Sequence, residues 1–201
     1  MRCLMCEKEL GYGSLTDILF GDDPLCHACR VKWKKKRIRF MFEGHRLRSS
    51  YVYNEAFSSC LIRYKELGDE ALKDAFLYED KNWFRHTYRG YTPVLMPSTK
   101  EKEEARGFSH LARMFECAGK ETISPFVKLS DRTQKGRTRA ERLAMSVNIG
   151  LKEGAVLPDK IVLCDDVITT GSTLRGALKA LEGYTGKIEI YTVSATSLWF
   201  R

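Results

Sequence analysis

The stretch "KIVLCDDVITTGSTL", residues 160–174, decides the fold. It opens with a short apolar run rich in branched residues, at positions 161–164, which predicts a buried strand. A loop of small residues follows, and residues 174–181 carry apolar side chains at helical spacing, so the unit is strand, loop, helix. Two adjacent carboxylates, Asp165 and Asp166, stand where the apolar run ends.

The loop has the composition of a phosphate-binding site. Its residues are Thr169, Thr170, Gly171, Ser172 and Thr173. The last three lie near the predicted helix N-terminus, where free amides and the helix dipole favour an anion. Because the preceding carboxylates repel phosphate, a ligand that suits both halves carries a phosphate at one end and hydroxyls or Mg²⁺ at the other. A ribose 5-phosphate has these two ends.

Two other phosphate-binding loops do not match. A Walker A loop ends in Gly-Lys-Ser/Thr, and the Gly-Lys pairs at 119–120 and 186–187 lack that ending. A dinucleotide fingerprint needs three spaced glycines, which the sequence does not have here. The remaining alternative is a strand followed by a capped helix whose acids face solvent, but capping explains neither the paired acids nor the double threonine.

Residues 162–173, "VLCDDVITTGST", resemble the phosphoribosyl pyrophosphate (PRPP) loop of type I phosphoribosyltransferases. In that family the acidic pair holds the ribose hydroxyls and the following loop wraps the 5-phosphate. The resemblance therefore implies that Asp165 and Asp166 are catalytic and bind the ribose of PRPP, with Mg²⁺, and that the five loop residues above bind its phosphate.

Composition limits the class of protein. The chain has 201 residues, enough for one sizeable core and a small appendage. Its 43% hydrophobic and 30% charged residues are typical of a soluble globular protein. No apolar run reaches the length of a membrane span, and the N-terminus lacks the apolar segment of a signal peptide, so we expect a cytoplasmic protein without membrane insertion.

The seven cysteines of such a protein are metal ligands or buried thiols more often than disulfides. Four of them form two Cys-x-x-Cys pairs, Cys3 with Cys6 and Cys26 with Cys29, and thiolates at this spacing can close a tetrahedral zinc site. Four protein ligands leave no open position, so the predicted zinc is structural. An iron–sulfur centre and four reduced thiols are the alternatives.

The excess positive charge lies in one segment. Residues 30–48 hold nine Lys and Arg against one Glu, whereas the rest of the chain has 25 basic and 25 acidic residues. Basic residues between aromatic rings suit a single-stranded nucleic acid, through phosphate neutralisation and base stacking. The predicted nucleic-acid-binding residues are Trp33, Lys34, Lys35, Lys36 and Arg37. The alternative is a solvated helical face whose aromatics dock on the neighbouring domain.

The rest of the chain alternates between strands and helices. Further strands are predicted at 49–57, 91–97, 123–129 and 187–195, and helices at 58–67, 69–77, 101–117 and 139–148. This alternation predicts an α/β domain with a mainly parallel sheet flanked by helices, in which ligands bind beyond the carboxyl ends of the strands. The predicted domains are a four-cysteine zinc-binding module (1–32), a basic linker (33–48) and a phosphoribosyltransferase-like domain (49–201).

A four-cysteine module in front of a type I phosphoribosyltransferase-like domain is similar to the competence protein F family. The segment from Arg63 to Asp69 resembles the family's pyrophosphate loop, Arg106-Gly107-Phe108 resembles a second landmark, and residues 132–145 resemble its flexible hood. The resemblance implies that pyrophosphate is bound by Tyr64, Lys65, Arg106 and Arg132. The histidines at positions 45, 86 and 110 have no motif around them.

The family resemblance also implies a role in DNA uptake during natural transformation, with single-stranded DNA and a competence helicase as partners. Three hypotheses follow. In the first, the chain is an enzyme that transfers the phosphoribosyl group of PRPP to an acceptor, which the sequence does not name. In the second, it handles nucleic acid and keeps the PRPP loop as a ligand or regulatory site. In the third, it is a non-catalytic, zinc-stabilised module that only docks the helicase. We favour a protein that combines the first two.

Overall fold

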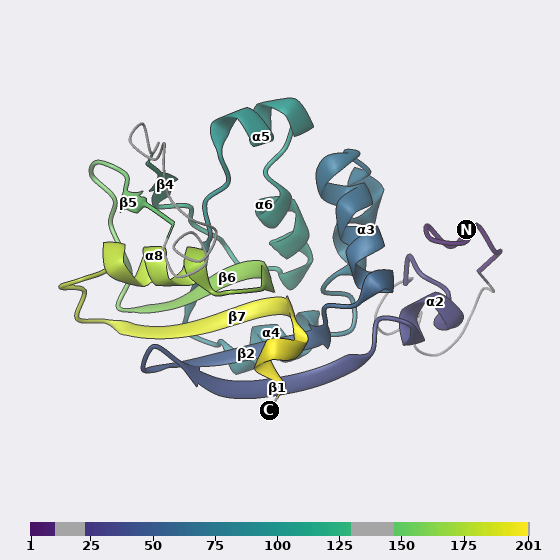
Figure 1. Ribbon diagram of the computed structural model, residues 1–201, viewed down its shortest axis with the longest axis horizontal. Helices are drawn as coiled ribbons and strands as arrows, with labels where there is room; N and C mark the ends of the chain where they lie inside the picture. The colour runs from purple at the N-terminus through teal and green to yellow at the C-terminus, as the bar shows by residue number, and fades with distance from the viewer. Residues whose placement is uncertain (11–22, 130–146, 201) are drawn as a thin grey trace.

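The computed structural model describes residues 1–10, 23–129 and 147–200, and its centre is a five-stranded sheet (Figure 1). The strands of this sheet are β1 (Lys35–Phe42), β2 (His45–Val52), β3 (Thr92–Leu95), β6 (Lys160–Ile168) and β7 (Lys187–Ala195). They lie in the order β1-β2-β7-β6-β3. Strands β1 and β2 are antiparallel, and all other neighbours are parallel. The predicted mainly parallel α/β architecture is confirmed.

Helices pack around this sheet, and a small hairpin stands beside it. The α-helices are α2 (His27–Val31), α3 (Glu55–Glu66), α4 (Lys81–Thr87), α5 (Lys100–Arg106), α6 (His110–Phe115) and α8 (Ser172–Ala180), and the 3₁₀ helices are η1 (Glu70–Ala75), η2 (Glu116–Ala118) and η3 (Ser197–Trp199). The hairpin pairs β4 (Phe126–Lys128) with β5 (Ile149–Leu151). None of the described helices is long and apolar enough to cross a membrane.

The central strands are buried because helices and loops cover them. Positions 161–164 of β6 are fully buried, as expected for an apolar run in the middle of a parallel sheet. On β7, the ring of Tyr191 packs against Phe84 of α4 and Phe115 of α6, with ring centroids 5.0 and 6.1 Å away. Figure 1 shows α3 and α6 next to the carboxyl ends of β6 and β7. Helices therefore border the carboxyl ends of both strands.

Several predicted elements differ in their bounds. The helix predicted at 101–117 is broken, because Gly107 adopts a left-handed conformation (φ 83°) that ends α5. The strand predicted at 49–57 stops at Val52, and the side chain of Asn54 caps the start of α3. Most of the helix predicted at 139–148 lies outside the described residues.

The basic segment is built into the sheet and is not a free linker. Residues 35–42 form β1, which is the edge strand of the five-stranded sheet. Lys35 and Arg37 lie 3.3 and 2.7 Å from the carboxylate of Asp80, which is completely buried. Because a buried carboxylate requires counter-ions, these two basic residues hold β1 against the start of α4. Half of the charge predicted to bind nucleic acid is thus engaged within the protein.

Trp33 belongs to the hydrophobic core. Its ring centroid is 4.8 Å from that of Phe57 and 5.5 Å from those of Tyr51 and Phe76, and the Arg30 guanidinium lies 4.7 Å from its centroid. The side chain is 0% exposed. The prediction that Trp33 stacks on a base is therefore wrong, because aromatic neighbours cover the ring. The alternative of docked aromatics describes this residue correctly, although the segment is a strand instead of a helix.

Candidate functional site

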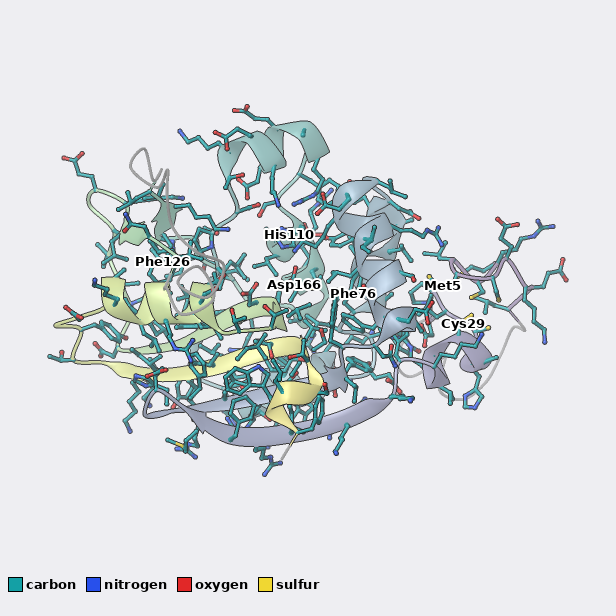
Figure 2. The ribbon with its side chains drawn as sticks, in the orientation of Figure 1. Met5, Cys29, Phe76, His110, Phe126 and Asp166 are labelled. Carbon is teal, nitrogen blue, oxygen red and sulfur yellow. The ribbon has the colours of Figure 1, made fainter. Side chains whose placement is uncertain are left out.

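The two adjacent acids occupy different environments at the end of β6. Asp166 is 5% exposed, and its Oδ2 atom lies 2.5 Å from Lys65 Nζ and 3.1 Å from His110 Nε2. Figure 2 shows Asp166 and His110 near each other between β6 and α6. Asp165 is half-buried, and its Oδ1 accepts a hydrogen bond of 3.0 Å from the Asp166 amide. Asp166 is thus held by two side chains, whereas Asp165 carries only a backbone contact among the described residues.

These surroundings separate the pKa values of the two acids. Burial works to raise the pKa of Asp166, but the hydrogen bond from His110 and the charge of Lys65 together lower it below its usual range. Burial and the negative charge of Asp166 raise the pKa of Asp165 to about 7. Asp166 is therefore ionised in the folded protein, and Asp165 titrates near neutral pH.

Positively charged side chains surround the acids. Burial opposes the charge of Lys65, but the attraction of Asp166 raises its pKa above its usual value. Arg106 donates from Nε to the Lys65 carbonyl (2.5 Å) and lies 3.0 Å from His110 Nδ1. Burial lowers the pKa of Lys128 in β4, and the nearby charge of Asp165 counteracts this. The predicted residues Lys65 and Arg106 are thus brought together with His110 and Lys128, which sequence analysis did not select.

Tyr64 and Arg132 were also predicted to bind pyrophosphate. The side chain of Tyr64 is fully buried, and its hydroxyl donates to the His110 carbonyl at 2.7 Å. The prediction that Tyr64 contacts pyrophosphate is therefore wrong for its side chain, which packs against Phe76 and Phe108. Arg132 lies outside the described residues.

Gly171 gives the predicted phosphate loop its shape. It caps α8 in a left-handed conformation (φ 78°), and a Cβ atom there would lie 2.6 Å from the ring of Phe42. Within the loop, the Thr170 hydroxyl lies 3.4 Å from the Ser172 amide and 3.2 Å from its hydroxyl. Thr173 is half-buried in the first turn of α8. Only glycine fits the turn and the contact with β1 together.

Neighbouring elements hold the loop from outside. The Thr169 carbonyl accepts a hydrogen bond of 2.7 Å from the Trp199 indole, and the Thr170 carbonyl accepts one of 2.9 Å from Arg175. Arg175 also pairs with Glu43 between β1 and β2, at 2.7 Å. The loop is therefore fixed before any ligand arrives, and its first-turn amides lie at the positive end of the α8 dipole.

A second cluster lies in the N-terminal module, at the other end of the molecule from β4 and β5 (Figure 2). The sulfur atoms of Cys3, Cys6, Cys26 and Cys29 all lie within 4.8 Å of one another. A tetrahedral site with Zn–S bonds of about 2.3 Å needs sulfurs about 3.8 Å apart, and Cys6 and Cys26 are separated by 3.6 Å. The four residues could therefore hold a metal such as zinc.

The module is attached to the helix that carries Lys65. Arg63 of α3 donates to the carbonyl of Leu4, between the first two cysteines, at 2.7 Å, and pairs with Asp69 at 2.6 Å. Arg30 donates to the Ala75 carbonyl at 2.7 Å. Arg63, a predicted family landmark, thus connects the cysteine cluster to α3.

The raised pKa of Asp165 predicts a stability that depends on pH. The folded state keeps this proton until about pH 7, whereas the unfolded chain releases it near pH 4, so the stability contributed by this group falls as pH rises between the two. Asp165→Asn should therefore raise the melting temperature more at pH 8 than at pH 5. Exposed Asp159 supplies the control Asp159→Asn, which should show no such difference. An equal effect of Asp165→Asn on the melting temperature at both pH values would show that the pKa of Asp165 is not raised.

Comparisons with known proteins identify relatives over most of the chain. Competence protein ComFC of Bacillus subtilis (strain 168) is 27% identical over 95% of this chain and 93% of that protein. Competence protein ComFC of Streptococcus pneumoniae (strain ATCC BAA-255 / R6) is 31% identical over 78% of this chain and 68% of that protein. No family model matches the sequence.

Among solved structures, a hypoxanthine phosphoribosyltransferase from Staphylococcus aureus is a neighbour with a TM-score of 0.41 and 14% identity, covering 65% of this chain and 66% of that chain. The identity and coverage of the two sequence relatives are those of homologues, and both relatives carry the same name. The chain belongs to the ComFC family of competence proteins.

Proposed function

We propose that this protein binds PRPP, or a ribose 5-phosphate ligand, with Mg²⁺ at the end of β6, and that it acts in natural transformation, as the name of its relatives indicates. One observation carries the proposal: the half-buried carboxylate of Asp165 stands between a glycine-capped loop at the start of α8 and a group of basic side chains. The proposal covers binding of the ligand. Transfer of the phosphoribosyl group to an acceptor would be a separate step and is not part of it.

Each part of the ligand has a complementary partner. The first-turn amides of α8 and the hydroxyls of Thr170 and Ser172 suit the 5-phosphate. Asp165 suits the ribose hydroxyls, because its carboxylate, which ionises above about pH 7, then only accepts hydrogen bonds. Lys65 and Lys128 suit the pyrophosphate. Mg²⁺ would bridge pyrophosphate and ribose oxygens and neutralise negative charge, and the oxygen ligands of Asp165 fit this ion.

Binding of Mg-PRPP, measured by calorimetry, tests this site. Asp165→Asn should weaken binding by about tenfold or more, as expected when a charged hydrogen-bond acceptor is lost. Chelation of Mg²⁺ should abolish binding by the parent. Asp159→Asn makes the same charge change on an exposed residue and should bind as the parent does. Equal affinities of the parent and Asp165→Asn would show that the ligand site is wrongly assigned. Release of pyrophosphate in the presence of an acceptor would establish transfer.

The N-terminal cluster is proposed as a structural zinc site. Burial opposes the ionisation of Cys3, but hydrogen bonds from the amides of Cys26, Cys6 and Met5 lower its pKa to about 6, whereas burial and hydrogen bonds with the other three cysteines raise the pKa of Cys29. Without metal the cluster therefore favours the thiolate, the form that binds metal, at Cys3 and not at Cys29. With four sulfur ligands the ion has no position for a substrate. Its contribution is therefore to the folding of the module and not to chemistry.

Metal analysis of purified protein should find one zinc per chain. Cys26→Ser should lose the metal and lower the melting temperature, because the free energy of metal binding to such a module is largely folding free energy. Cys117→Ser removes a thiol that lies outside the cluster and should keep the zinc. Iron in the parent, or a well-folded parent without any metal, would refute structural zinc.

The basic strand is proposed to contact single-stranded DNA through its remaining exposed side chains. Lys34, Lys36 and Arg39 are exposed, and the Lys36 ammonium lies 5.1 Å from the ring of Phe200. On the same strand, Phe40 stacks on Trp199 with centroids 5.1 Å apart. These cations and half-buried rings, and not those predicted around Trp33, are therefore the groups proposed to bind phosphates and stack on bases. A helicase partner stays a prediction from the family resemblance.

Two matched double variants distinguish basic residues that contact DNA from basic residues that only compensate the buried charge of Asp80. Lys34→Gln with Lys36→Gln should weaken binding to single-stranded DNA and reduce the salt slope by about 1.4, because two phosphate contacts are lost. Lys35→Gln with Arg37→Gln removes the same charge but should change the slope less and lower the melting temperature, because Asp80 loses its counter-ions. Identical slopes for the parent and both variants would refute DNA contact by β1.

A further inference from the structure

The contact of Arg106 with His110 determines which nitrogen of the imidazole ring carries the proton. The two atoms, Arg106 Nη1 and His110 Nδ1, are 3.0 Å apart. A guanidinium group can only donate hydrogen bonds, so Nδ1 must accept and cannot carry a proton. The ring is then neutral with its proton on Nε2, which donates to Asp166 Oδ2 at 3.1 Å.

The charges around the ring favour the same state. His110 is 5% exposed, and burial lowers its pKa, although the Asp166 carboxylate works in the opposite direction. The cations Lys65 and Arg106 on either side add to the lowering. His110 is therefore a fixed hydrogen-bond donor to Asp166 and not a carrier of protons near neutral pH.

Backbone contacts fix the position of the ring as well. His110 is the first residue of α6, and its carbonyl accepts a hydrogen bond of 2.7 Å from the Tyr64 hydroxyl. Arg106, at the end of α5, donates to the carbonyl of Lys65 at 2.5 Å. A closed set of contacts thus joins α3, α5, α6 and β6 around one carboxylate oxygen.

The two oxygens of Asp166 are used unequally. Both Lys65 and His110 contact Oδ2, and no hydrogen bond reaches Oδ1 from any residue in the described ranges. Of the two partners, His110 is immobilised by Arg106 and by its own helix, whereas Lys65 contacts Asp166 through the end of a flexible side chain. Only Lys65 can leave without moving a helix.

We propose that His110 is a positioning residue for the ribose phosphate site: it holds Asp166 in one orientation, so that Oδ1 faces the ligand and Lys65 can leave Oδ2 for an incoming pyrophosphate. The proposal rests on the proposed function, because it assigns the roles of residues within that site. Asp165 and Asp166 then have different tasks: the half-buried Asp165 contacts the ribose, whereas Asp166 is anchored through Oδ2 and keeps only Oδ1 for the ligand.

Two substitutions at one position distinguish positioning from packing. His110→Leu fills the space without a polar group. His110→Gln offers an oxygen to Arg106 and an N–H to Asp166, so it can reproduce both hydrogen bonds. His86 in α4 is exposed, and His86→Leu serves as the control for loss of a histidine. All three variants and the parent are compared by calorimetry with Mg-PRPP between pH 6 and pH 8.5, after circular dichroism has confirmed that each is folded.

We expect leucine at position 110 to weaken the binding of Mg-PRPP and glutamine to restore it. His110→Leu should weaken binding by about tenfold, the order expected for a lost hydrogen bond to a charged group. His110→Gln should bind within about threefold of the parent and keep its pH dependence. The other charged groups near Asp166 are Lys65, Asp165, Lys128 and Arg106, and none of them is changed in these variants.

The outcomes separate this proposal from the proposed function. If the parent binds Mg-PRPP and His110→Leu binds equally well at every pH, the positioning role is overturned while the site stands. If both His110 variants lose binding to the same extent, the role is packing and the proposal is again overturned. Failure of the parent itself to bind would overturn the proposed function together with the positioning role of His110.

Should His110→Leu fail to fold, nitrogen NMR of the parent decides the geometry. The imidazole of His110 should stay neutral, with its proton on Nε2, from pH 6 to pH 8. A ring that is protonated at pH 7, or that carries its proton on Nδ1, would overturn the proposal, because Nδ1 could then not accept from Arg106.

Discussion

A buried carboxylate at the end of a central strand is the constraint on which the rest of the structure depends. Taking Asp166 out of water costs several kcal/mol unless cations and hydrogen-bond donors compensate for it. Lys65 of α3 and His110 of α6 supply both, and Arg106 fixes the histidine. Two helices far apart in the sequence are thereby held over the end of β6, where a ligand-binding site of this fold class lies.

The same rule explains the basic segment. Asp80 is as deeply buried as Asp166, and it is compensated by Lys35 and Arg37 from the edge strand. The charge of this segment is therefore divided between a structural share and an exposed share, which includes Lys34 and Lys36. The β1–β2 connection also reaches the predicted phosphate loop, because Glu43 pairs with Arg175, which donates to the Thr170 carbonyl. The basic strand and the loop are therefore neighbours, so that changes in one can affect the other.

Sequence patterns predicted the parts of this protein that depend on local order. The strand and helix around residues 160–174 and the cysteine cluster follow from periodicity and spacing, and the structure has both. The role of His110 could not be predicted, because it depends on a contact with Asp166, 56 residues away. For the same reason the sequence left the burial of Trp33 open as an alternative: its neighbours Phe57 and Phe76 come from distant elements, and a charge run does not reveal them.

The central claim is that the end of β6 and the start of α8 form one ribose phosphate site. A crystal structure of the protein with ribose 5-phosphate and Mg²⁺ tests it most directly. We expect the phosphate at the amides of residues 171–173, the ribose hydroxyls at Asp165, and His110 still bound to Asp166 as in the free protein. A ligand bound elsewhere, or a phosphate that contacts only the basic strand β1, would show that the end of β6 and the start of α8 do not form this site.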